Sequence, residues 1–458
     1  MFKHLLKLLI PALMLFIPVY ALASGTSNVP MVGGIRIEFI IFALTLVGVA
    51  LFHNHTMWVA LIGLSTVLAI KFIFDDQFDL GAHIVGNEHH EGEWKTLVNL
   101  IGLLFGFGIL AKHFEESKVP EILPKFLPNG YMGAVVLLFI IMVISSFLDN
   151  IAAAMIGGTI ALVVFKNKVH IGYIAAIVAA SNAGGAGSVV GDTTTTIMWI
   201  EGVDPLAVLP AFVASIAAFL IFGFAAASQQ HKLQEITADA PSGIKVDGKK
   251  LLVVLMILIG AIVTNYMSNA GIYEEIFFGP AVGVWIAILL GALITSTPWE
   301  EIKSAFAGTI FLTALVTCAS LMPVDDLPAA SWQTALSLGF VSAVFDNIPL
   351  TKLCLEQGGY DWGMLAYAVG FGGSMIWFGS SAGVAITNKF PEARSVVSYV
   401  KNGWHVAVAY VVGFFVMYLT LGWNPTDHKA GKAEDKDKTK TEQHEGHDDH
   451  EHSGEHAH

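Results

Sequence analysis

The sequence predicts an all-α integral membrane protein made of two inverted-topology repeats, each with a helical hairpin and a glycine-broken transmembrane helix. Three observations predict this fold. The chain of 458 residues is 55% hydrophobic and 13% charged, with a mean hydropathy of +0.66, which excludes an ordinary soluble domain. Apolar runs long enough to cross a bilayer recur along it. A short Asp-Asn stretch also occurs twice, each time in apolar surroundings.

The apolar runs have the length that is needed to cross about 30 Å of hydrocarbon. They occur at residues 35–52, 56–74, 95–112, 205–227, 251–268, 276–296, 306–322 and 404–422. Two further runs, 170–200 and 363–388, are rich in glycine and hydroxyl side chains. The segments 131–165 and 331–358 are each long enough for two helical arms, and they predict hairpins that enter and leave on one side.

The N-terminal segment, residues 1–23, has the layout of a secretory signal peptide. Lys3 and Lys7 precede an apolar stretch, and Ala21-Leu22-Ala23 forms a cleavage site. An uncleaved first helix is the alternative. Either way residue 24 lies outside the cytoplasm, and the hairpin interpretation then places most of the lysine-rich loops in the cytoplasm, as is typical of short cytoplasmic loops.

This orientation divides the chain into a first repeat, 24–227, a cytoplasmic linker, 228–250, and a second repeat, 251–423. Each repeat is expected to have five crossings and one hairpin. Because five is odd, the second repeat is upside down relative to the first. Inverted repeats whose broken helices meet near the midplane are the plan of many secondary transporters.

The repeated stretch places a carboxylate inside an apolar run in each repeat. It reads Phe147-Leu148-Asp149-Asn150 in the first repeat and Val344-Phe345-Asp346-Asn347 in the second. A carboxylate at membrane depth costs several kcal/mol and usually marks an ion or proton path. The two copies therefore predict one site that is built twice.

A glycine-interrupted crossing follows each hairpin. Residues 181–196 and 370–383 share three glycines at a constant offset of 188 residues: Gly184, Gly185 and Gly191 match Gly372, Gly373 and Gly379. Glycine lets a helix unwind, and unwound carbonyls and half-helix ends can coordinate a cation. The alternative is that these glycines only allow close helix packing, which does not explain Asp192 in the first stretch.

Three carboxylates, Asp149, Asp192 and Asp346, form the centre of the predicted site. Hard cations prefer oxygen ligands, and burial raises the pKa of a carboxyl group, so that a proton and a cation can compete for it near neutral pH. The neutral oxygens expected to complete the site belong to Asn150, Asn182, Asn347, Thr194, Thr195, Ser380 and Ser381. Capping of the hairpin arms is an equally good role for the asparagines, and both roles can hold together.

Lys352 lies within the second hairpin segment. It can pair with Asp346 or another carboxylate, carry a transported proton itself, or extend to the outer surface by snorkelling. The spans contain no arginine except Arg36 at an edge, which argues against a site for an anionic substrate. Cys318 and Cys354 lie in apolar segments and are expected to be free, buried thiols.

These motifs resemble those of the NhaD-type sodium/proton antiporters of the ion transporter superfamily, whose relatives include citrate and arsenite permeases. The resemblance rests on Asp149-Asn150, residues 181–196, residues 346–350 and residues 372–384. It implies exchange of Na⁺, sometimes Li⁺, for H⁺ across the bacterial inner membrane, with both mature termini in the periplasm. It also implies two inverted repeats and often a homodimer. In the family the position of Lys352 is usually uncharged.

The C-terminal segment, residues 424–458, is rich in acidic residues, lysine and histidine without an apolar period, and is expected to be disordered. Four of its histidines, His444, His447, His450 and His452, are candidates for loose Zn²⁺ binding, and a solvated tail is the alternative. No other cofactor and no nucleic-acid partner is expected. The sequence shows no ATP-binding motif or catalytic domain, so we expect no enzyme.

Two other functions stay open. The same fold supports a Na⁺-coupled symporter of citrate or a related organic anion, which saturable Na⁺-dependent citrate uptake would indicate. The histidine-rich tail instead suggests a metal-responsive sensor that transports nothing. The sensor predicts that Asp149→Asn leaves function intact, whereas deletion of residues 424–458 abolishes it.

Overall fold

The computed structural model describes residues 29–52, 55–87, 90–236, 243–269 and 279–426. The expected signal peptide, 1–23, and most of the expected tail, 424–458, lie outside these residues. The tail histidines considered as metal ligands, His444, His447, His450 and His452, also lie outside them.

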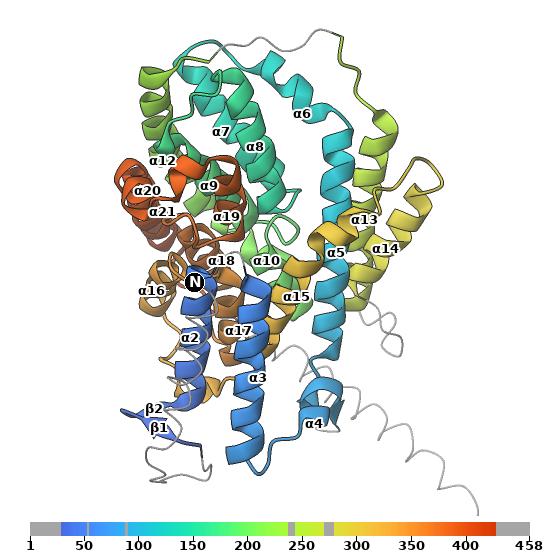
Figure 1. Cartoon of the computed structure of the whole chain (residues 1–458), viewed down its shortest axis with the longest axis vertical. Coiled ribbons are helices and arrows are strands. Elements are labelled where there is room, and N and C mark those ends of the chain that lie inside the picture. Colours follow the sequence, from blue (N-terminus) through green and yellow to red (C-terminus); the bar gives the residue numbers. More distant parts are fainter. Residues whose placement is uncertain (1–28, 53–54, 88–89, 237–242, 270–278, 427–458) are drawn as a thin grey trace, which may run out of the picture.

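The described chain is mainly helical (Figure 1). Among the described residues, five helical segments are long and apolar enough to cross a membrane: α3 (Thr56–Phe74), α5 (Trp94–Glu116), α11 with α12 (Pro205–Leu233), α15 (Glu301–Ser320) and α21 (Trp404–Leu421). Further apolar helices are α2 (Ile37–Leu51), α13 (Gly248–Asn269) and α14 (Pro280–Gly291). These helices lie on the apolar runs of the sequence, which confirms the expected all-α membrane fold.

Small elements connect the long helices. Two antiparallel strand pairs depart from the all-helical expectation: β1 (Met31–Val32) with β2 (Ile35–Arg36), and β3 (Gly86–Asn87) with β4 (His90–Glu91). The first pair turns at Gly33 and Gly34, whose φ angles of +60° and +83° favour glycine. The short helices are α4 (Leu80–Val85), α6 (Val119–Ile122), η1 (Leu123–Phe126), η2 (Val324–Asp326), η3 (Pro391–Arg394) and α20 (Val396–Asn402). Helix α12 (Ala211–Leu233) continues beyond residue 228, into the segment expected as a linker.

Each segment that was expected to hold two arms does contain two helices. The first contains α7 (Tyr131–Ser145) and α8 (Asn150–Val164), and the second contains α16 (Trp332–Ser342) and α17 (Asn347–Gln357). The second helix of each pair begins at the asparagine of the Asp-Asn stretch. The short turns between the helices therefore hold the two aspartates.

The two glycine-rich crossings are broken helices. The first consists of α9 (Ile171–Ala186) and α10 (Thr193–Ile200), and the second of α18 (Trp362–Gly372) and α19 (Ser381–Lys389). A β-carbon on Gly185 would lie 2.6 Å from the carbonyl oxygen of Gly191, and one on Gly373 would lie 2.6 Å from that of Gly379. Since real β-carbons do not approach so closely, each break needs glycine at this point.

Matching contacts join each hairpin to the broken helix that follows it. Ser145 Oγ donates to the carbonyl oxygen of Ser181 at 2.6 Å, and Ser342 Oγ donates to that of Val369 at 2.7 Å. Ser342 lies 197 residues after Ser145, and Val369 lies 188 residues after Ser181. Both offsets equal those of the Asp-Asn and glycine motifs, so the two segments share local packing as well as sequence.

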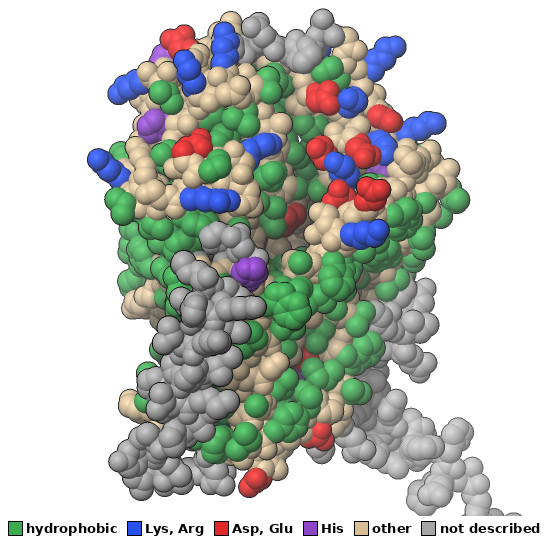
Figure 2. Space-filling view, viewed as in Figure 1, with side chains coloured by type: hydrophobic (Ala, Val, Ile, Leu, Met, Phe, Trp, Pro, Cys, Tyr) green, Lys and Arg blue, Asp and Glu red, His purple; other side chains and the backbone are tan. Residues whose placement is uncertain are grey.

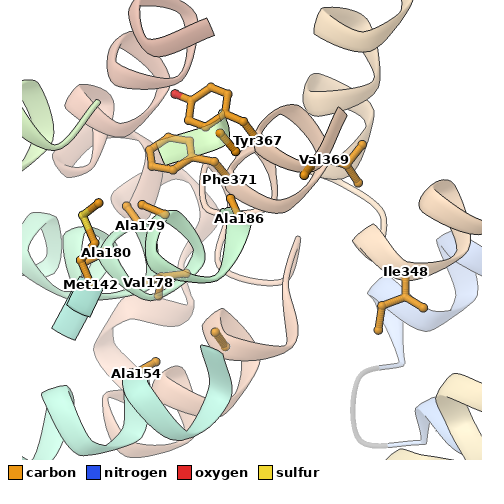
Figure 3. Packing of buried hydrophobic residues seen from close by; sticks show 14 of the residues in the cluster. Met142, Ala154, Val178, Ala179, Ala180, Ala186, Ile348, Tyr367, Val369 and Phe371 are labelled. Atoms are coloured by element: carbon orange, nitrogen blue, oxygen red, sulfur yellow. The ribbon is translucent and has the colours of Figure 1, made fainter. Parts of the chain in front are cut away.

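The broken helices α9 and α18 pack directly against each other. Figure 3 shows small side chains of α9, including Ala179 and Ala186, beside the aromatic rings of Tyr367 and Phe371 on α18. The two rings stack with centroids 5.2 Å apart. Small residues on one helix let its backbone approach the neighbouring helix closely, which brings the two helix breaks near each other.

The helices form two groups that meet at α10 and α17. In the first group, α9 contacts α7, α8, α12, α18 and α19, and α12 contacts α21. In the second group, α5 contacts α13, α14 and α15, and α15 contacts α3. Helix α10 contacts both α5 and α17, and α17 contacts α15. Figure 1 shows α5, α13 and α14 of the second group on the right of the molecule, apart from α7 and α8 at the upper end.

Candidate functional site

The three aspartates of the predicted site each cap the N-terminus of a helix. Asp149 Oδ2 accepts from the backbone N–H of Ile151 at 3.2 Å, and Asp346 Oδ1 accepts from that of Ile348 at 3.1 Å. Asp192 Oδ1 accepts from the N–H of Thr194 at 3.3 Å. The positive end of a helix dipole therefore faces each carboxylate, which favours negative charge there. Capping of the hairpin arms, considered for the asparagines, is done by the aspartates that precede them.

The asparagines form a bridge between the two halves of the chain. Asn150 Nδ2 donates to Asn182 Oδ1 at 3.0 Å and to Asp192 Oδ1 at 3.2 Å. Asn182 Nδ2 donates in turn to the hydroxyls of Ser374 at 2.9 Å and Ser380 at 3.2 Å. Asn150 and Asn182 are both buried. The bridge connects the first hairpin with both broken helices and holds Asp192 at their junction.

Two buried oxygen atoms at this junction have no hydrogen-bond partner. They are Asp192 Oδ2 and Thr194 Oγ1, and the exposed fractions of their residues are 2% and 0%. A buried carboxylate oxygen without a partner is costly unless a cation or a proton satisfies it. The space beside it is open because Gly370 of α18 has no side chain. A β-carbon at Gly370 would lie 3.0 Å from Asp192 Oδ2.

The other hydroxyl groups of the predicted site have differing surroundings. Thr195 Oγ1 donates toward backbone carbonyls, 2.6 Å from that of Ser188 and 2.9 Å from that of Asp192, and so holds the helix break together. Ser380 caps α19 and accepts from Gly383 N at 3.3 Å. Ser381 Oγ lies 3.4 Å from Asp346 Oδ2. Asn347 is 3% exposed at the start of α17.

A cavity of about 630 Å³ leads to the site from one end of the molecule. Asp149, Asp192, Thr193 and Ser381 line its inner part. Its mouth lies near the C-terminus of α5 and has charged side chains of both signs: Lys112, Glu115, Glu121, Glu301 and Lys389. Figure 2 shows the hollow between the two helix groups and the Lys and Arg side chains gathered around the same end. The volume lies within the usual range for small-ligand sites.

Lys352 does not contact Asp346; it lies in a separate cluster of glutamates. Its Nζ atom lies 2.9 Å from Glu93 Oε2, 2.6 Å from Glu201 Oε1 and 2.8 Å from Glu356 Oε1. The lysine side chain is fully buried, so snorkelling to the surface does not occur in this structure. Of the alternatives considered for Lys352, pairing with a carboxylate other than Asp346 is the one that the structure has, although the sequence did not identify these three glutamates. The spacing of four residues between Lys352 and Glu356 on one helix was the available signal.

Ser374 is a further buried contact of the site that was not among the predicted ligands. It directly follows the glycine pair of the second stretch, so the motif itself pointed to it. Cys318 and Cys354 are free and buried, as expected. Among the described residues no cluster of three or more His, Cys, Asp and Glu side chains has an arrangement suited to a metal ion.

These features define the protein as a multi-pass, mainly helical membrane protein in which broken helices meet at a buried polar site. No protein-family model matches the chain. It resembles sodium/proton antiporter 1 of Arabidopsis thaliana, with 26% identity over 335 residues that cover 63% of this chain and 54% of the plant protein. The chain therefore spans about half the length of that relative.

Two bacterial relatives match as well. The Na⁺/H⁺ antiporter NhaD of Vibrio cholerae is 24% identical over 336 residues, which cover 61% of this chain and 68% of that protein. An uncharacterized transporter of Mycobacterium tuberculosis is 24% identical over 395 residues, which cover 76% of this chain and 88% of that protein. The expected resemblance to NhaD-type antiporters is thus confirmed.

Proposed function

We propose that this protein is a secondary active transporter that exchanges Na⁺ or Li⁺ for H⁺ across the bacterial inner membrane. The observation that carries the proposal is the pair of unpartnered oxygens, Asp192 Oδ2 and Thr194 Oγ1, buried where the broken helices meet. Asp192 lines the inner part of a cavity that Asp149 also lines. Relatives in three organisms that are named sodium/proton antiporters support the same function.

The chemistry of exchange follows from the protonation of these carboxylates. A protonated carboxyl group at Asp149, Asp192 or Asp346 is neutral, and a hard cation needs the ionised form as its ligand. When Na⁺ binds, the carboxyl group gives up its proton to water in the cavity. When the cation leaves, a proton returns. The Thr194 hydroxyl and the asparagine amide oxygens add neutral ligands. They replace the water ligands of the cation and so lower the free-energy cost of its dehydration.

The alternative as an organic-anion symporter has less support from the site. The inner part of the cavity has carboxylates, and its cationic lining residues, Lys112 and Lys389, belong to the mouth. A fixed positive charge beside the substrate is the usual means of holding an organic anion. We therefore place citrate transport second.

We also propose that the two halves are inverted repeats with the boundaries 24–227 and 251–423, joined by the linker 228–250. The shared serine contacts and glycine breaks support this relation. Alternating access then comes from movement of one helix group against the other around the fixed site. The protein would have both mature termini in the periplasm and could pair as a homodimer.

Transport by the purified full chain in proteoliposomes tests the function. With a pH-sensitive dye inside, addition of NaCl or LiCl should move protons, whereas KCl and citrate should not. Asp149→Asn, Asp192→Asn and Asp346→Asn should each remove the response. Asp204→Asn is the matched control, because Asp204 also caps a helix, α11, but is exposed. A response to citrate alone, or full exchange by Asp149→Asn, would overturn the proposal.

A further inference from the structure

The buried Lys352 cluster, made of Lys352, Glu93, Glu201 and Glu356, joins three different helices. Lys352 and Glu356 both belong to α17. Glu201 immediately follows α10, and Glu93 immediately precedes α5. Glu93 binds the lysine with both oxygens, at 3.1 and 2.9 Å. Three carboxylates thus surround one fully buried ammonium group.

The cluster lies at the end of the molecule that is opposite the cavity mouth. Helix α5 runs from Glu93 to the mouth residues Lys112 and Glu115. At 1.5 Å per residue, Glu93 and Lys112 are separated by about 28 Å along the helix axis. Lys352 lies six residues beyond Asp346 on α17, which is about 9 Å along its axis. Asp149 and Asp192 are therefore open toward the cavity mouth, and the Lys352 cluster lies beyond them on the opposite side.

Glu93 differs from the other two glutamates because it belongs to the second helix group. Helix α5 packs against α13, α14 and α15. Glu356 lies on the same helix as Lys352, and Glu201 directly follows α10, which packs against α17. A movement of the second helix group away from α10 and α17 would therefore break the contact between Lys352 and Glu93. It would leave the contacts of Lys352 with Glu201 and Glu356 in place.

We propose that Glu93 is a gating residue, whose ion pair with Lys352 closes the site on the side away from the cavity. The pair separates when the site opens on that side. This inference rests on the proposed transport function, which requires alternating access. A buried ion pair suits such a gate because the cost of removing both charges from water offsets most of their attraction.

Opening leaves no buried charge without a partner. Lys352 keeps its contacts with Glu201 and Glu356. Glu93 is already 14% exposed and turns toward water as α5 moves. Three carboxylates for one lysine also leave the opened side with negative charge, which attracts an incoming cation.

Accessibility of the site to a thiol reagent tests the gate without depending on ion exchange. Ala152 lines the cavity next to Asp149. Ala152→Cys is introduced in the full chain with Cys318→Ala and Cys354→Ala, and a membrane-impermeant maleimide is added to intact cells or to inverted membranes. In this variant, whose Lys352 cluster is unaltered, labelling should be fast from the side of the cavity mouth and slow from the other side.

Glu93→Gln should raise the rate of labelling from the side away from the cavity mouth by about fivefold or more. A factor of about five is the lower end of the typical effect of one site on another in a coupled protein. Glu356→Gln is the matched control. It also removes one carboxylate that pairs with Lys352, but this carboxylate lies on the same helix as Lys352 and does not connect the two helix groups. It should change the rate less than twofold. Glu93→Asp, which keeps the negative charge at this position, should be labelled more slowly than Glu93→Gln.

Equal rates in Glu93→Gln and Glu356→Gln would overturn the gate. If Glu93→Gln does not fold, Glu93→Ala decides: a folded Glu93→Ala variant that is labelled from the side away from the cavity mouth as slowly as Glu356→Gln would equally overturn it. Failure of Na⁺/H⁺ exchange in the unmodified protein would appear in the proton assay and not in these labelling rates. The two proposals can therefore fail separately.

Discussion

Replacing Lys352 by methionine is the substitution whose effect on stability the structure predicts most directly. Methionine has a similar length and volume, so the change removes mainly the charge. It leaves Glu93, Glu201 and Glu356 without the ammonium group that now lies within 2.6 to 2.9 Å of each. Removing one partner of a buried ion pair costs about 3–5 kcal/mol. Because the glutamates are 14%, 16% and 22% exposed, we expect the lower end, about 3 kcal/mol.

The loss should depend on pH, and its sign follows from Glu93. Burial raises the pKa of the Glu93 carboxyl group, although Lys352 opposes the rise. Without Lys352 this folded-state pKa rises further above the unfolded value. A raised folded-state pKa means that stability is present at low pH and is lost as pH rises through that pKa. The deficit of Lys352→Met should therefore be smaller at about pH 5 than at about pH 8.

The assay is thermal unfolding of the purified protein in detergent, followed by tryptophan fluorescence at both pH values. Lys112→Met is the control, because Lys112 pairs at 2.7 Å with Glu115 where the two side chains are 34% and 61% exposed. Such a surface pair contributes at most about 1 kcal/mol. Equal unfolding midpoints for the two variants at pH 8, or a larger deficit for Lys352→Met at pH 5, would refute the reasoning.

Three further predictions concern the site and the tail. Gly370→Ala should weaken Na⁺ affinity by about fivefold or more, since its β-carbon would lie beside Asp192 Oδ2. The Michaelis constant in the exchange assay checks this, and Gly248→Ala, whose β-carbon would meet no neighbour within 4 Å, is the control. Gly184→Ala should lower stability by about 1–3 kcal/mol, because its β-carbon would collide with the carbonyl oxygen of Met142; unfolding midpoints measure it against the same control. Deletion of residues 427–458 should leave exchange intact, and a folded deletion variant without exchange would favour the sensor hypothesis.

The positions of the helices could be predicted well from the sequence because their signals are local. An apolar run was expected at 56–74, and α3 covers Thr56–Phe74. The breaks in the two glycine-rich crossings were also predictable, since only glycine tolerates the close approach of the neighbouring backbone there. The Asp-Asn stretches also predicted the helix starts at Asn150 and Asn347, because an aspartate that caps a helix directly precedes it in the sequence.

The contacts of the site depend on distant parts of the chain and could be predicted only in part. Residue types and apolar surroundings predicted that Asn150, Asn182 and Asp192 lie in one site, and the structure brings these three into contact. The partners of Lys352 were not predicted, because Glu93 and Glu201 lie 259 and 151 residues away from it. No local pattern connects residues at such separations, and only the packing of α5 and α10 against α17 brings them together. The backbone role of Thr195 was missed because its partners depend on the shape of the helix break.

Proton release on cation binding is the measurement that tests the central claim, competition of a cation and protons for the same carboxylates. The purified full chain is placed in weakly buffered detergent solution, and the pH is recorded as NaCl or, for comparison, choline chloride is added. We expect acidification by NaCl alone, retained in Asp204→Asn and absent in Asp192→Asn. The same release by Asp192→Asn, or no release by a protein that exchanges Na⁺ for H⁺ in proteoliposomes, would contradict the claim.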